Sequence, residues 1–456
     1  MSRRATVRLH VKQNKATEIH REKLSSSEPV EGSYFVSSYP PFSTWGESEV
    51  GAYRAALGRE TGTDTPLGLY VHIPFCDARC RYCYYLSEAN PDEEAVEDYV
   101  DCVLRELEYY STALALRMRP LSFLYFGGGT PSMLSPGQIR RMMAGVSVSF
   151  SCAAGAEATF ECAPKTATPE RLKELNDCGV TRLSIGVQQL DDEVLRSNGR
   201  IHSVRDVEEA VACADSVDFD IVNLDLIVGL VNETEESFFR SLEDVIALGP
   251  ESVTLYQLEI PFNTPLARAL RQRPDEMAVP SWETKRQRLS SAFDSLESAG
   301  YTVRSAYAAV RDPVKHRFVY QEAQYHGADL IGVGASAFSY LDGVHHQNIA
   351  STDRYRARLN DGEQPFYRAH ALSSEERMIR EFVLQLKLGG CMTREFRERF
   401  DVDVLDVFAE PLARFEELGW IKADSDEVRV TRAGLVRVDR LIPAFYREEH
   451  QGIRYS

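Results

Sequence analysis

Short apolar runs alternate with longer amphipathic segments along the chain from Leu67 onward. Compact apolar runs predict strands, and apolar positions spaced three or four residues apart predict helices. The strands predicted in this way are 69–73, 121–126, 158–162, 182–187, 221–228 and 252–258. The helices predicted between and after them are 93–112, 135–144, 169–178, 204–215, 235–248 and 281–299.

This alternation of strands and helices indicates an α/β fold. A strand, a crossover helix and a second strand form a right-handed unit, so a series of such units predicts a parallel sheet. Residues 328–341 predict one further strand and turn. Because the motifs described below follow predicted strands, we expect the chemistry at the carboxyl ends of the strands.

The two ends of the chain differ from this core. Residues 1–66 are polar with scattered aromatic residues and predict an irregular arm. From Ser373 a Glu/Arg-rich helical pattern leads into a hairpin around 424–426 and a helix near 435–442, which is typical of a winged-helix-like module. Its many carboxylates favour a structural lid over a DNA-binding role. We expect an N-terminal arm (1–66), a core with its extension (67–345) and a C-terminal accessory domain (346–456).

Composition narrows the class of protein. The chain has 456 residues, 43% of them hydrophobic, and a formal charge of −17, which argues against binding to nucleic acid or to an anionic membrane. The sequence has no run of about 18 apolar residues, and its basic first residues lack the apolar segment of a signal peptide. We therefore expect a cytoplasmic monomer that acts on a small-molecule substrate.

Three cysteines stand in one short loop after the first predicted strand. Cys76, Cys80 and Cys83 have the spacing C-x3-C-x2-C. Three thiolates can hold three irons of a [4Fe–4S] cubane and leave the fourth iron without a protein ligand. S-adenosylmethionine (SAM) can chelate that iron, and an electron from the cluster can then cleave SAM to methionine and a 5′-deoxyadenosyl radical. The spacing therefore predicts a cluster that cleaves SAM.

A structural zinc site is the alternative interpretation of these cysteines. It needs a fourth ligand such as His72 and normally shows a second C-x2-C pair, which this sequence lacks. The other cysteines stand singly on predicted elements and are expected to be buried apolar side chains: Cys102, Cys152, Cys162, Cys178, Cys213 and Cys391.

A series of motifs resembles the HemN-like branch of the radical SAM proteins, which includes the oxygen-independent coproporphyrinogen III oxidases. The resemblance implies a partial (βα)6 TIM-like barrel, a [4Fe–4S] cluster, SAM and a flavodoxin- or ferredoxin-type electron donor. The motifs are YVHIPFCDARCRYC (70–83), YFGGGTPSML (125–134), TFECAP (159–164), RLSIGVQ (182–188), NGRIHS (198–203), NLDLIVGL (223–230) and DLIGVGASAF (329–338).

The resemblance assigns two groups of SAM contacts to the ends of strands. Gly128, Gly129 and Thr130 follow the second strand, where backbone without side chains can approach the methionyl group closely. Asp225 resembles the acid that accepts hydrogen bonds from the ribose hydroxyls. An acid within an otherwise apolar strand is costly unless it has such a partner.

Further polar and aromatic residues resemble SAM contacts of the family. Glu161, Gln188 and Arg200 resemble residues that bind its polar groups, and Arg200 suits a bidentate clamp on the methionyl carboxylate. A structural alternative is that Glu161 and Arg200 pair with each other. Tyr82, inside the cysteine loop, resembles the aromatic residue that flanks adenine.

Two other aromatic residues, Tyr70 and Phe338, match positions that line a second SAM in the coproporphyrinogen oxidases. Members of the family that transfer methyl groups also use two SAM molecules, one as radical source and one as methyl donor. The resemblance therefore implies two SAM molecules in this chain.

The sequence also departs from the coproporphyrinogen oxidases. There, a Gly-Cys-Asn run follows the third cysteine, whereas here Tyr84, Tyr85 and Leu86 follow it. Val231 stands where a proline is usual, and the arm around Trp45 differs from that branch. These changes place decarboxylation of coproporphyrinogen in doubt and leave radical generation intact.

Three functions compete on this evidence. We rank first a class C methyltransferase or cyclopropanase that adds a SAM-derived carbon to an sp2 carbon. The second is oxidative decarboxylation of coproporphyrinogen III, for which the propionates require several basic residues facing the barrel. The third is a haem chaperone, for which His345 and His346 offer an axial ligand, although a polar loop is the plainer interpretation of that pair.

Overall fold

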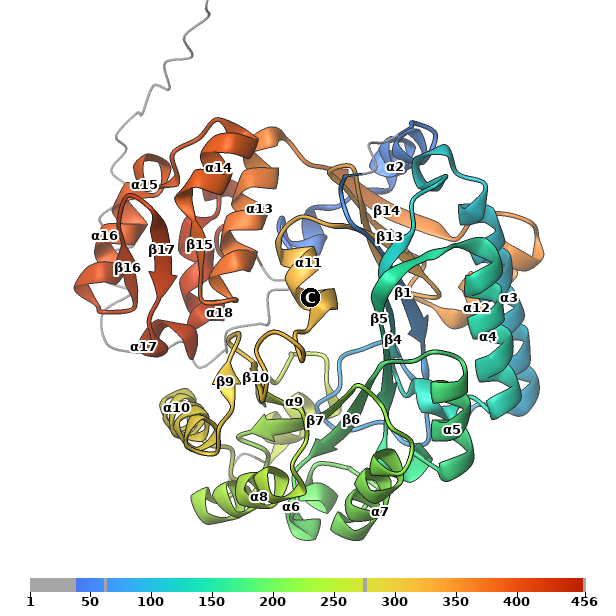
Figure 1. The fold of residues 1–456 in the computed structure, drawn as a ribbon, viewed down its shortest axis with the longest axis horizontal. Helices are drawn as coiled ribbons and strands as arrows, with labels where there is room; N and C mark the ends of the chain where they lie inside the picture. Colours follow the sequence, from blue (N-terminus) through green and yellow to red (C-terminus); the bar gives the residue numbers. More distant parts are fainter. Residues whose placement is uncertain (1–37, 61–63, 274–276, 454–456) are drawn as a thin grey trace, which may run out of the picture.

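The computed structural model describes residues 38–60, 64–273 and 277–453. A twelve-stranded sheet curves through the larger part of the molecule, in the order β14-β13-β12-β11-β1-β4-β5-β6-β7-β8-β10-β9 (Figure 1). All adjacent pairs from β1 to β8 are parallel, which confirms the predicted α/β partial barrel. These six strands are β1 (Leu67–Ile73), β4 (Leu121–Gly128), β5 (Cys152–Cys162), β6 (Arg182–Gln188), β7 (Ile221–Val228) and β8 (Ser252–Gln257).

The crossover helices cover the convex side of this sheet (Figure 1). Capping boxes at Ser135, Ser203 and Thr234 satisfy the first backbone N–H groups of three of them, so these helices begin where the sequence places a hydroxyl. The helices are α3 (Glu93–Ser111), α4 (Pro136–Ser149), α5 (Pro169–Asp177), α6 (Asp192–Ser197), α7 (Val204–Asp215), α8 (Glu235–Leu248) and α10 (Trp282–Ser298).

Both edges of the parallel sheet carry additional strands. On one side β11 (Asp329–Val333) pairs parallel to β1, and β12 (Phe338–Leu341), β13 (Val344–Asn348) and β14 (Phe366–Ala371) follow antiparallel. On the other side lie β10 (Ala308–Val310) and β9 (Thr302–Val303). The expected boundary between residues 345 and 346 falls inside β13, so we propose that the core extends to Ala371. The remaining helices near the core are α9 (Pro265–Gln272), α11 (Val319–Tyr325) and α12 (Thr352–Asn360).

The N-terminal arm contains a helix where the sequence predicted irregular structure. In α2 (Val50–Leu57) the buried Tyr53 ring stacks on His346 at a centroid distance of 4.2 Å. His345 and His346 themselves lie in β13 and are buried, so the prediction of a polar loop at this pair is wrong. Residues 1–37 of the predicted arm lie outside the described residues.

The C-terminal domain has its own hydrophobic core, built from helices and a short hairpin as the sequence predicted. It lies beside α11, across the open side of the curved sheet (Figure 1). Its elements are α13 (Ser374–Leu386), β15 (Gly390–Met392), α14 (Thr393–Phe400), α15 (Val404–Val407), α16 (Ala409–Glu417), β16 (Ile421–Ala423), β17 (Glu427–Val430), α17 (Arg432–Leu435) and α18 (Val438–Leu441).

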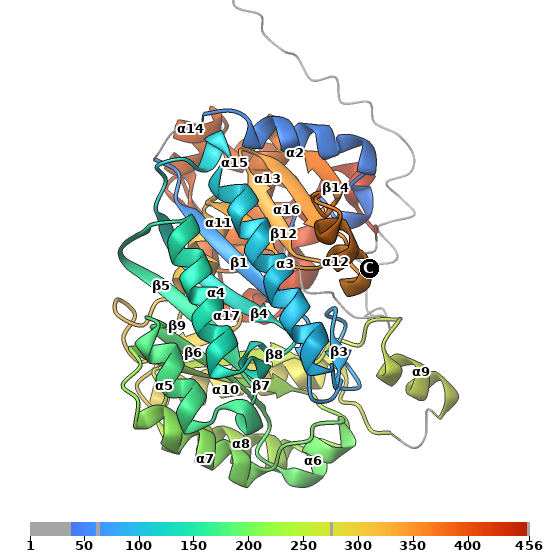
Figure 2. The ribbon, with the colours of Figure 1, turned by 90° about the vertical axis from the view of Figure 1, so that its right-hand side faces the viewer.

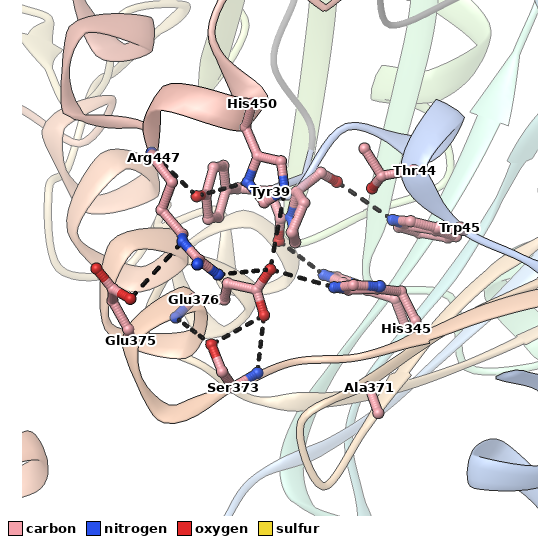
Figure 3. A network of polar contacts seen from close by, with 12 residues as sticks. Tyr39, Thr44, Trp45, His345, Ala371, Ser373, Glu375, Glu376, Arg447 and His450 are labelled. Carbon is pink, nitrogen blue, oxygen red and sulfur yellow. Dashed lines mark hydrogen bonds and ion pairs between the residues drawn. The ribbon is translucent and has the colours of Figure 1, made fainter.

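A buried polar cluster joins the arm to this domain (Figure 3). The Tyr39 hydroxyl lies 2.8 Å from Nδ1 of His450, and its backbone carbonyl lies 3.1 Å from Nε2 of His345. Glu376 at the start of α13 lies within ion-pair distance of Arg447 and His450. We call this group the arm clasp; it links the arm, β13, α13 and the tail after α18.

The single cysteines are less uniformly buried than the sequence predicted. Cys102, Cys162 and Cys391 are buried, but Cys152 at the start of β5 is exposed. In the part of the chain that the structure describes, every helix is too short or too polar to cross a bilayer.

Gly68 offers a test of packing in β1. A Cβ at this position would overlap the buried ring of Phe123, so we expect Gly68→Ala to lower the free energy of unfolding by about 1–3 kcal/mol. A Cβ at Gly51 in α2 would meet no atom within 4 Å, so Gly51→Ala should be neutral or stabilise by about 0.5–1 kcal/mol. Denaturant unfolding of both variants measures the difference, and equal midpoints would contradict the packing argument.

Candidate functional site

The cysteine loop rests directly on the backbone of the glycine-rich turn after β4. The Gly129 N–H donates to the Ile73 carbonyl at 2.8 Å, and the Thr130 N–H donates to the Phe75 carbonyl at 2.7 Å. A Cβ on Gly129 would lie 2.7 Å from that Phe75 oxygen. The sequence predicted that these glycines allow SAM to approach the backbone. The structure shows that the close packing of the cysteine loop also requires them. Their contact with SAM stays a prediction.

His72 fixes the far end of the cysteine loop. Its Nε2 lies 3.2 Å from the Leu86 carbonyl and its Nδ1 lies 3.0 Å from the Tyr70 hydroxyl. A carbonyl only accepts, so Nε2 carries the proton and Nδ1 accepts from Tyr70. Burial lowers the pKa of His72 to about 4, which keeps the ring neutral. Both ring nitrogens are therefore engaged, and this argues against His72 as a zinc ligand.

The three thiols lie close enough to influence one another. Cys76 accepts a hydrogen bond from the Thr130 hydroxyl at 3.5 Å, and Cys80 accepts one from Nη1 of Arg200 at 3.3 Å. Burial and the charge of Cys80 raise the pKa of Cys83 to about 11. Among the described residues, no three His, Cys, Asp or Glu side chains are arranged to bind one metal ion together. A cubane does not need that arrangement, because each thiolate binds a different iron.

Arg200 and Glu161 reach the cysteine loop from different sides and do not pair with each other. Nη2 of Arg200 donates to the Gly186 carbonyl at 2.6 Å, while its buried Nε has no hydrogen-bond partner within the described ranges. Glu161 accepts from the Tyr125 hydroxyl at 2.5 Å and from the Gly128 N–H at 3.2 Å. The structural alternative of a Glu161–Arg200 pair is therefore wrong, and the orphaned Nε suits a ligand with acceptor oxygens.

The acid in β7 lies in a ring of neutral donors. Asp225 accepts from Nδ2 of Asn223 at 2.8 Å and from the Ser184 hydroxyl at 3.2 Å. Burial raises its pKa to about 6. Gln188, at the end of β6, has a left-handed φ of 67° beside a register shift of that strand. Gln188 ends β6, as the sequence predicted, whereas Asp225 lies within β7; their contacts to SAM stay predictions.

The structure explains why a valine, and not the usual proline, stands at position 231. Its N–H donates to Oδ1 of Asn198 at 3.1 Å, and its carbonyl accepts from Nδ2 of Asn198 at 3.0 Å. A proline has no N–H and would lose the first bond. The Asn198 carbonyl also accepts from the Arg81 N–H at 3.2 Å. Val231 thus helps to fix the loop that carries Arg200 against the cysteine loop.

The predicted aromatic contacts occupy two places. The Tyr82 ring packs with an apolar group that includes Ile227 and Leu230, and its hydroxyl is buried without a partner among the described residues. Tyr70 faces Tyr125 from β1. Phe338 packs against Phe42 and Trp45 of the arm, at ring centroid distances of 5.0 and 5.6 Å. The arm therefore covers one wall of the predicted second SAM site.

Sequence reasoning missed a group of tyrosines inside the curved sheet. Tyr84, Tyr85 and Tyr256 are 41%, 49% and 38% exposed, yet burial raises the pKa of all three, that of Tyr85 to about 12. Tyr84 stacks on Tyr85, and the charge of Glu161 acts on both Tyr85 and Tyr256, so these partly accessible side chains lie near one another; we call this group the tyrosine lumen. Tyr125 and Tyr320 stack at its wall with a centroid distance of 4.3 Å. The signal in the sequence was the inward parity of Tyr125 and Tyr256 on their strands.

The basic side chains beside the tyrosine lumen are already neutralised. Arg182 lies 3.9 Å from Glu157 and places its guanidinium 4.6 Å from the centre of the Phe318 ring. Lys387, under the rings of Tyr307 and Tyr325, pairs with Asp439 at 2.9 Å. Glu161 and Asp225 add two buried carboxyl groups to the same interior.

The raised pKa of Glu161 predicts a pH dependence of stability. Burial raises it to about 7, whereas an unfolded glutamate titrates near ~4.3. Between these two pKa values the folded chain therefore binds more protons than the unfolded chain. The free energy of unfolding consequently falls as pH rises through about 7. The free energy of unfolding should fall less between about pH 5 and 8 in Glu161→Gln than in the wild type, by up to ~3 kcal/mol. The surface variant Glu235→Gln should keep the wild-type slope, and equal slopes for all three proteins would refute the assignment.

Comparison with known proteins places this site in a family. The radical SAM superfamily model matches residues 70–245, and the HemN C-terminal domain model matches residues 372–437. The chain is 29% identical over 406 residues to an oxygen-independent coproporphyrinogen III oxidase of Pseudomonas aeruginosa, covering 84% of this chain and 87% of that protein.

Two further relatives agree with this placement. The chain is 34% identical over 274 residues to the haem chaperone HemW of Escherichia coli, covering 60% of this chain and 69% of that protein. The solved structure of the coproporphyrinogen III oxidase HemN of Escherichia coli superposes with a TM-score of 0.80 at 27% identity, over 90% of this chain and 96% of that one. The cysteine loop on its glycine turn, the curved sheet and the C-terminal domain thus have counterparts along the whole fold, and this chain belongs to the HemN-like family of radical SAM proteins.

Proposed function

We propose that this chain cleaves SAM to a 5′-deoxyadenosyl radical and directs the radical at a tetrapyrrole substrate held in the tyrosine lumen. The observation that carries the proposal is the position of Tyr84 and Tyr85, which follow Cys83 directly and line the lumen. A radical formed at the cysteine loop is thereby adjacent to the space where a substrate fits. Aromatic walls suit the pyrrole rings of a tetrapyrrole.

The chain's own residues provide the contacts that SAM needs. In this proposal the orphaned Nε of Arg200 donates to the methionyl carboxylate, and Glu161 accepts from the methionyl ammonium. Asp225 is placed to accept from the ribose hydroxyls. The cluster, when bound to Cys76, Cys80 and Cys83, supplies the electron that cleaves SAM.

Oxidative decarboxylation of a porphyrinogen is the reaction that the relatives favour. The relatives named coproporphyrinogen III oxidases align with more than four fifths of this chain. In this reaction the radical abstracts a hydrogen atom from a propionate, and the substrate radical then loses carbon dioxide and passes one electron to an acceptor, which leaves a vinyl group. The whole-length similarity therefore reverses the order of functions that the sequence motifs alone favoured.

Methyl transfer or cyclopropanation with a second SAM is the second candidate. Two observations favour it: Tyr84 and Tyr85 replace the Gly-Cys-Asn run, and Arg182 and Lys387 are already paired with carboxylates. A lumen without free basic side chains at these positions suits a neutral substrate better than four propionates. Tyr70 and Phe338 are the residues proposed to line the second SAM.

The haem-chaperone function loses its proposed ligands. His345 and His346 are both buried in β13, where His345 contacts the Tyr39 carbonyl and His346 stacks on Tyr53. Burial lowers the pKa of His346 to about 3, so the ring stays neutral. Haem binding by this chain would require other residues.

The fate of the SAM methyl group separates the two enzymatic functions. With SAM carrying an isotopically labelled methyl group, decarboxylation of coproporphyrinogen III should yield carbon dioxide, methionine and 5′-deoxyadenosine, with no label in the product. Methyl transfer should yield S-adenosylhomocysteine beside 5′-deoxyadenosine and a labelled product. S-adenosylhomocysteine formation without carbon dioxide release would overturn the first ranking.

All three thiols of the loop should be needed together for the cluster. Reconstituted Cys80→Ala should lose its visible charge-transfer absorption and at least about 100-fold of its SAM cleavage, because the remaining two thiolates cannot hold a cubane with one open iron. Cys152→Ala, at the exposed first residue of β5, is the matched control and should keep wild-type iron content. Normal 5′-deoxyadenosine formation by Cys80→Ala would reject the cluster assignment.

A further inference from the structure

One face of α10 carries a row of polar side chains. Glu283, Arg286, Gln287 and Ser290 recur at intervals of three and four residues, so they share one face of this helix. α17 lies next to α10 in both views of the ribbon (Figure 1, Figure 2). Because α10 belongs to the core and α17 to the C-terminal domain, the two helices form part of the interface between these domains.

An open cavity of about 540 Å³ lies in this interface. Its lining shares no residue with the cysteine loop or the tyrosine lumen. α10 contributes Arg286, Gln287 and Ser290 to the lining, and the C-terminal domain contributes Arg432 and Arg437. Guanidinium and amide groups donate hydrogen bonds, and a hydroxyl can donate as well. A cavity of this size can hold a small molecule, and its walls offer mainly donors.

The lining of this cavity carries an excess of positive charge, although the whole chain is acidic. Three arginines stand there beside one carboxylate, Glu283. Glu283 pairs with Arg437 at 3.4 Å, and Glu297, at the far end of α10, pairs with Arg432 at 2.5 Å. The two carboxylates thus hold one arginine at each end of the helix, and the buried Arg286 adds a further positive charge between them.

The arginines around the cavity repel one another. Burial, together with the positive charges of Arg440 and Arg437, lowers the pKa of Arg286 to about 10. Like charges held close together in a partly buried place raise the free energy of the folded state, and an anion bound between them lowers it again. The electrostatics of the folded chain therefore favour an anion in this cavity.

Arg432 provides a donor that the described residues do not use. Its Nη1 is buried and has no hydrogen-bond partner among them, whereas its Nη2 donates to Glu297. The guanidinium also lies 5.0 Å from the centre of the Phe293 ring, a contact that helps to fix its orientation. Buried donors without a partner are rare in folded proteins. Anionic oxygens are the acceptors that suit a guanidinium best.

The same segment of the C-terminal domain is bonded to the end of β8. Nε2 of Gln257 donates to the Val436 carbonyl at 3.1 Å, and Val436 also lines the cavity. Gln257 directly follows Tyr256, which belongs to the tyrosine lumen. A ligand that holds residues 432–437 against α10 therefore also holds the partner of Gln257 in place.

We propose that this cavity binds a small anion with two or more phosphate groups, and that the bound anion holds the C-terminal domain against α10. Phosphate oxygens can accept from several guanidiniums at once, and Gln287 and Ser290 add neutral donors. The inference does not depend on the proposed SAM cleavage, because the cavity and the proposed SAM contacts have no residue in common.

Calorimetric titration of the reconstituted holoenzyme with inorganic pyrophosphate, in buffer without magnesium, tests the proposal. Arg286→Gln with Arg432→Gln should weaken binding at least about tenfold relative to the wild type. The matched control is Arg205→Gln with Arg394→Gln, which also removes one arginine from each domain. Both control arginines are exposed and pair within their own helices, so this variant should keep the wild-type affinity.

A second variant keeps all the arginines and so separates binding from folding. Ser290→Glu places a carboxylate at the cavity wall, and it should also weaken pyrophosphate binding at least about tenfold. Saturating pyrophosphate should raise the thermal unfolding midpoint of the wild type and the control by at least about 2 °C and leave that of Ser290→Glu unchanged. Constant visible absorption of the cluster during the titration shows that pyrophosphate does not act by removing iron.

A nucleoside diphosphate in place of pyrophosphate separates two sources of the same chemistry. Equal affinity would assign recognition to the phosphate groups alone, and tighter binding would add a contact to the nucleoside; both results support the proposal. Absence of binding by the wild type at about 1 mM pyrophosphate would overturn it. Equal affinities for the wild type, both cavity variants and the control would overturn it as well.

Discussion

The backbone of the Gly128–Thr130 turn and the backbone of the cysteine loop lie in direct contact, and the geometry of the site depends on this contact. Two N–H groups of the turn donate to carbonyls of the loop, and a side chain on Gly129 would separate them. The same turn sends the Gly128 N–H to Glu161 and the Thr130 hydroxyl to Cys76. One close approach of two main chains thus sets the positions of a thiol and a carboxylate together.

The interior around this contact accepts buried acids because neutral donors surround them. Glu161 and Asp225 each receive two hydrogen bonds from uncharged groups, and burial raises the pKa of both. A carboxyl in such a place can remain protonated while it is alone and ionise when a cationic or donating ligand arrives. The strands therefore carry polar residues inside the sheet at limited cost to folding.

The sequence predicted the parallel core well because its elements depend on local pattern. The strand 221–228 and the helices 204–215 and 235–248 have the predicted bounds, since apolar periodicity and hydroxyl caps agree there. The polar strand β13 and the short helix α2 were missed because they stabilise each other through Tyr53 and His346, a contact between distant segments. The tyrosine lumen was missed for the same reason, since residues of separate strands and loops form it.

Figure 3 shows residues from both ends of the described chain in one place. Tyr39 is synthesised early, but its partners Glu376, Arg447 and His450 lie more than three hundred positions later in the chain. The arm clasp therefore cannot close on a growing polypeptide until almost the whole chain has left the ribosome. Contacts of such high sequence separation form late in folding. The arm that covers Phe338 is accordingly fastened to the C-terminal domain only at a late stage of assembly.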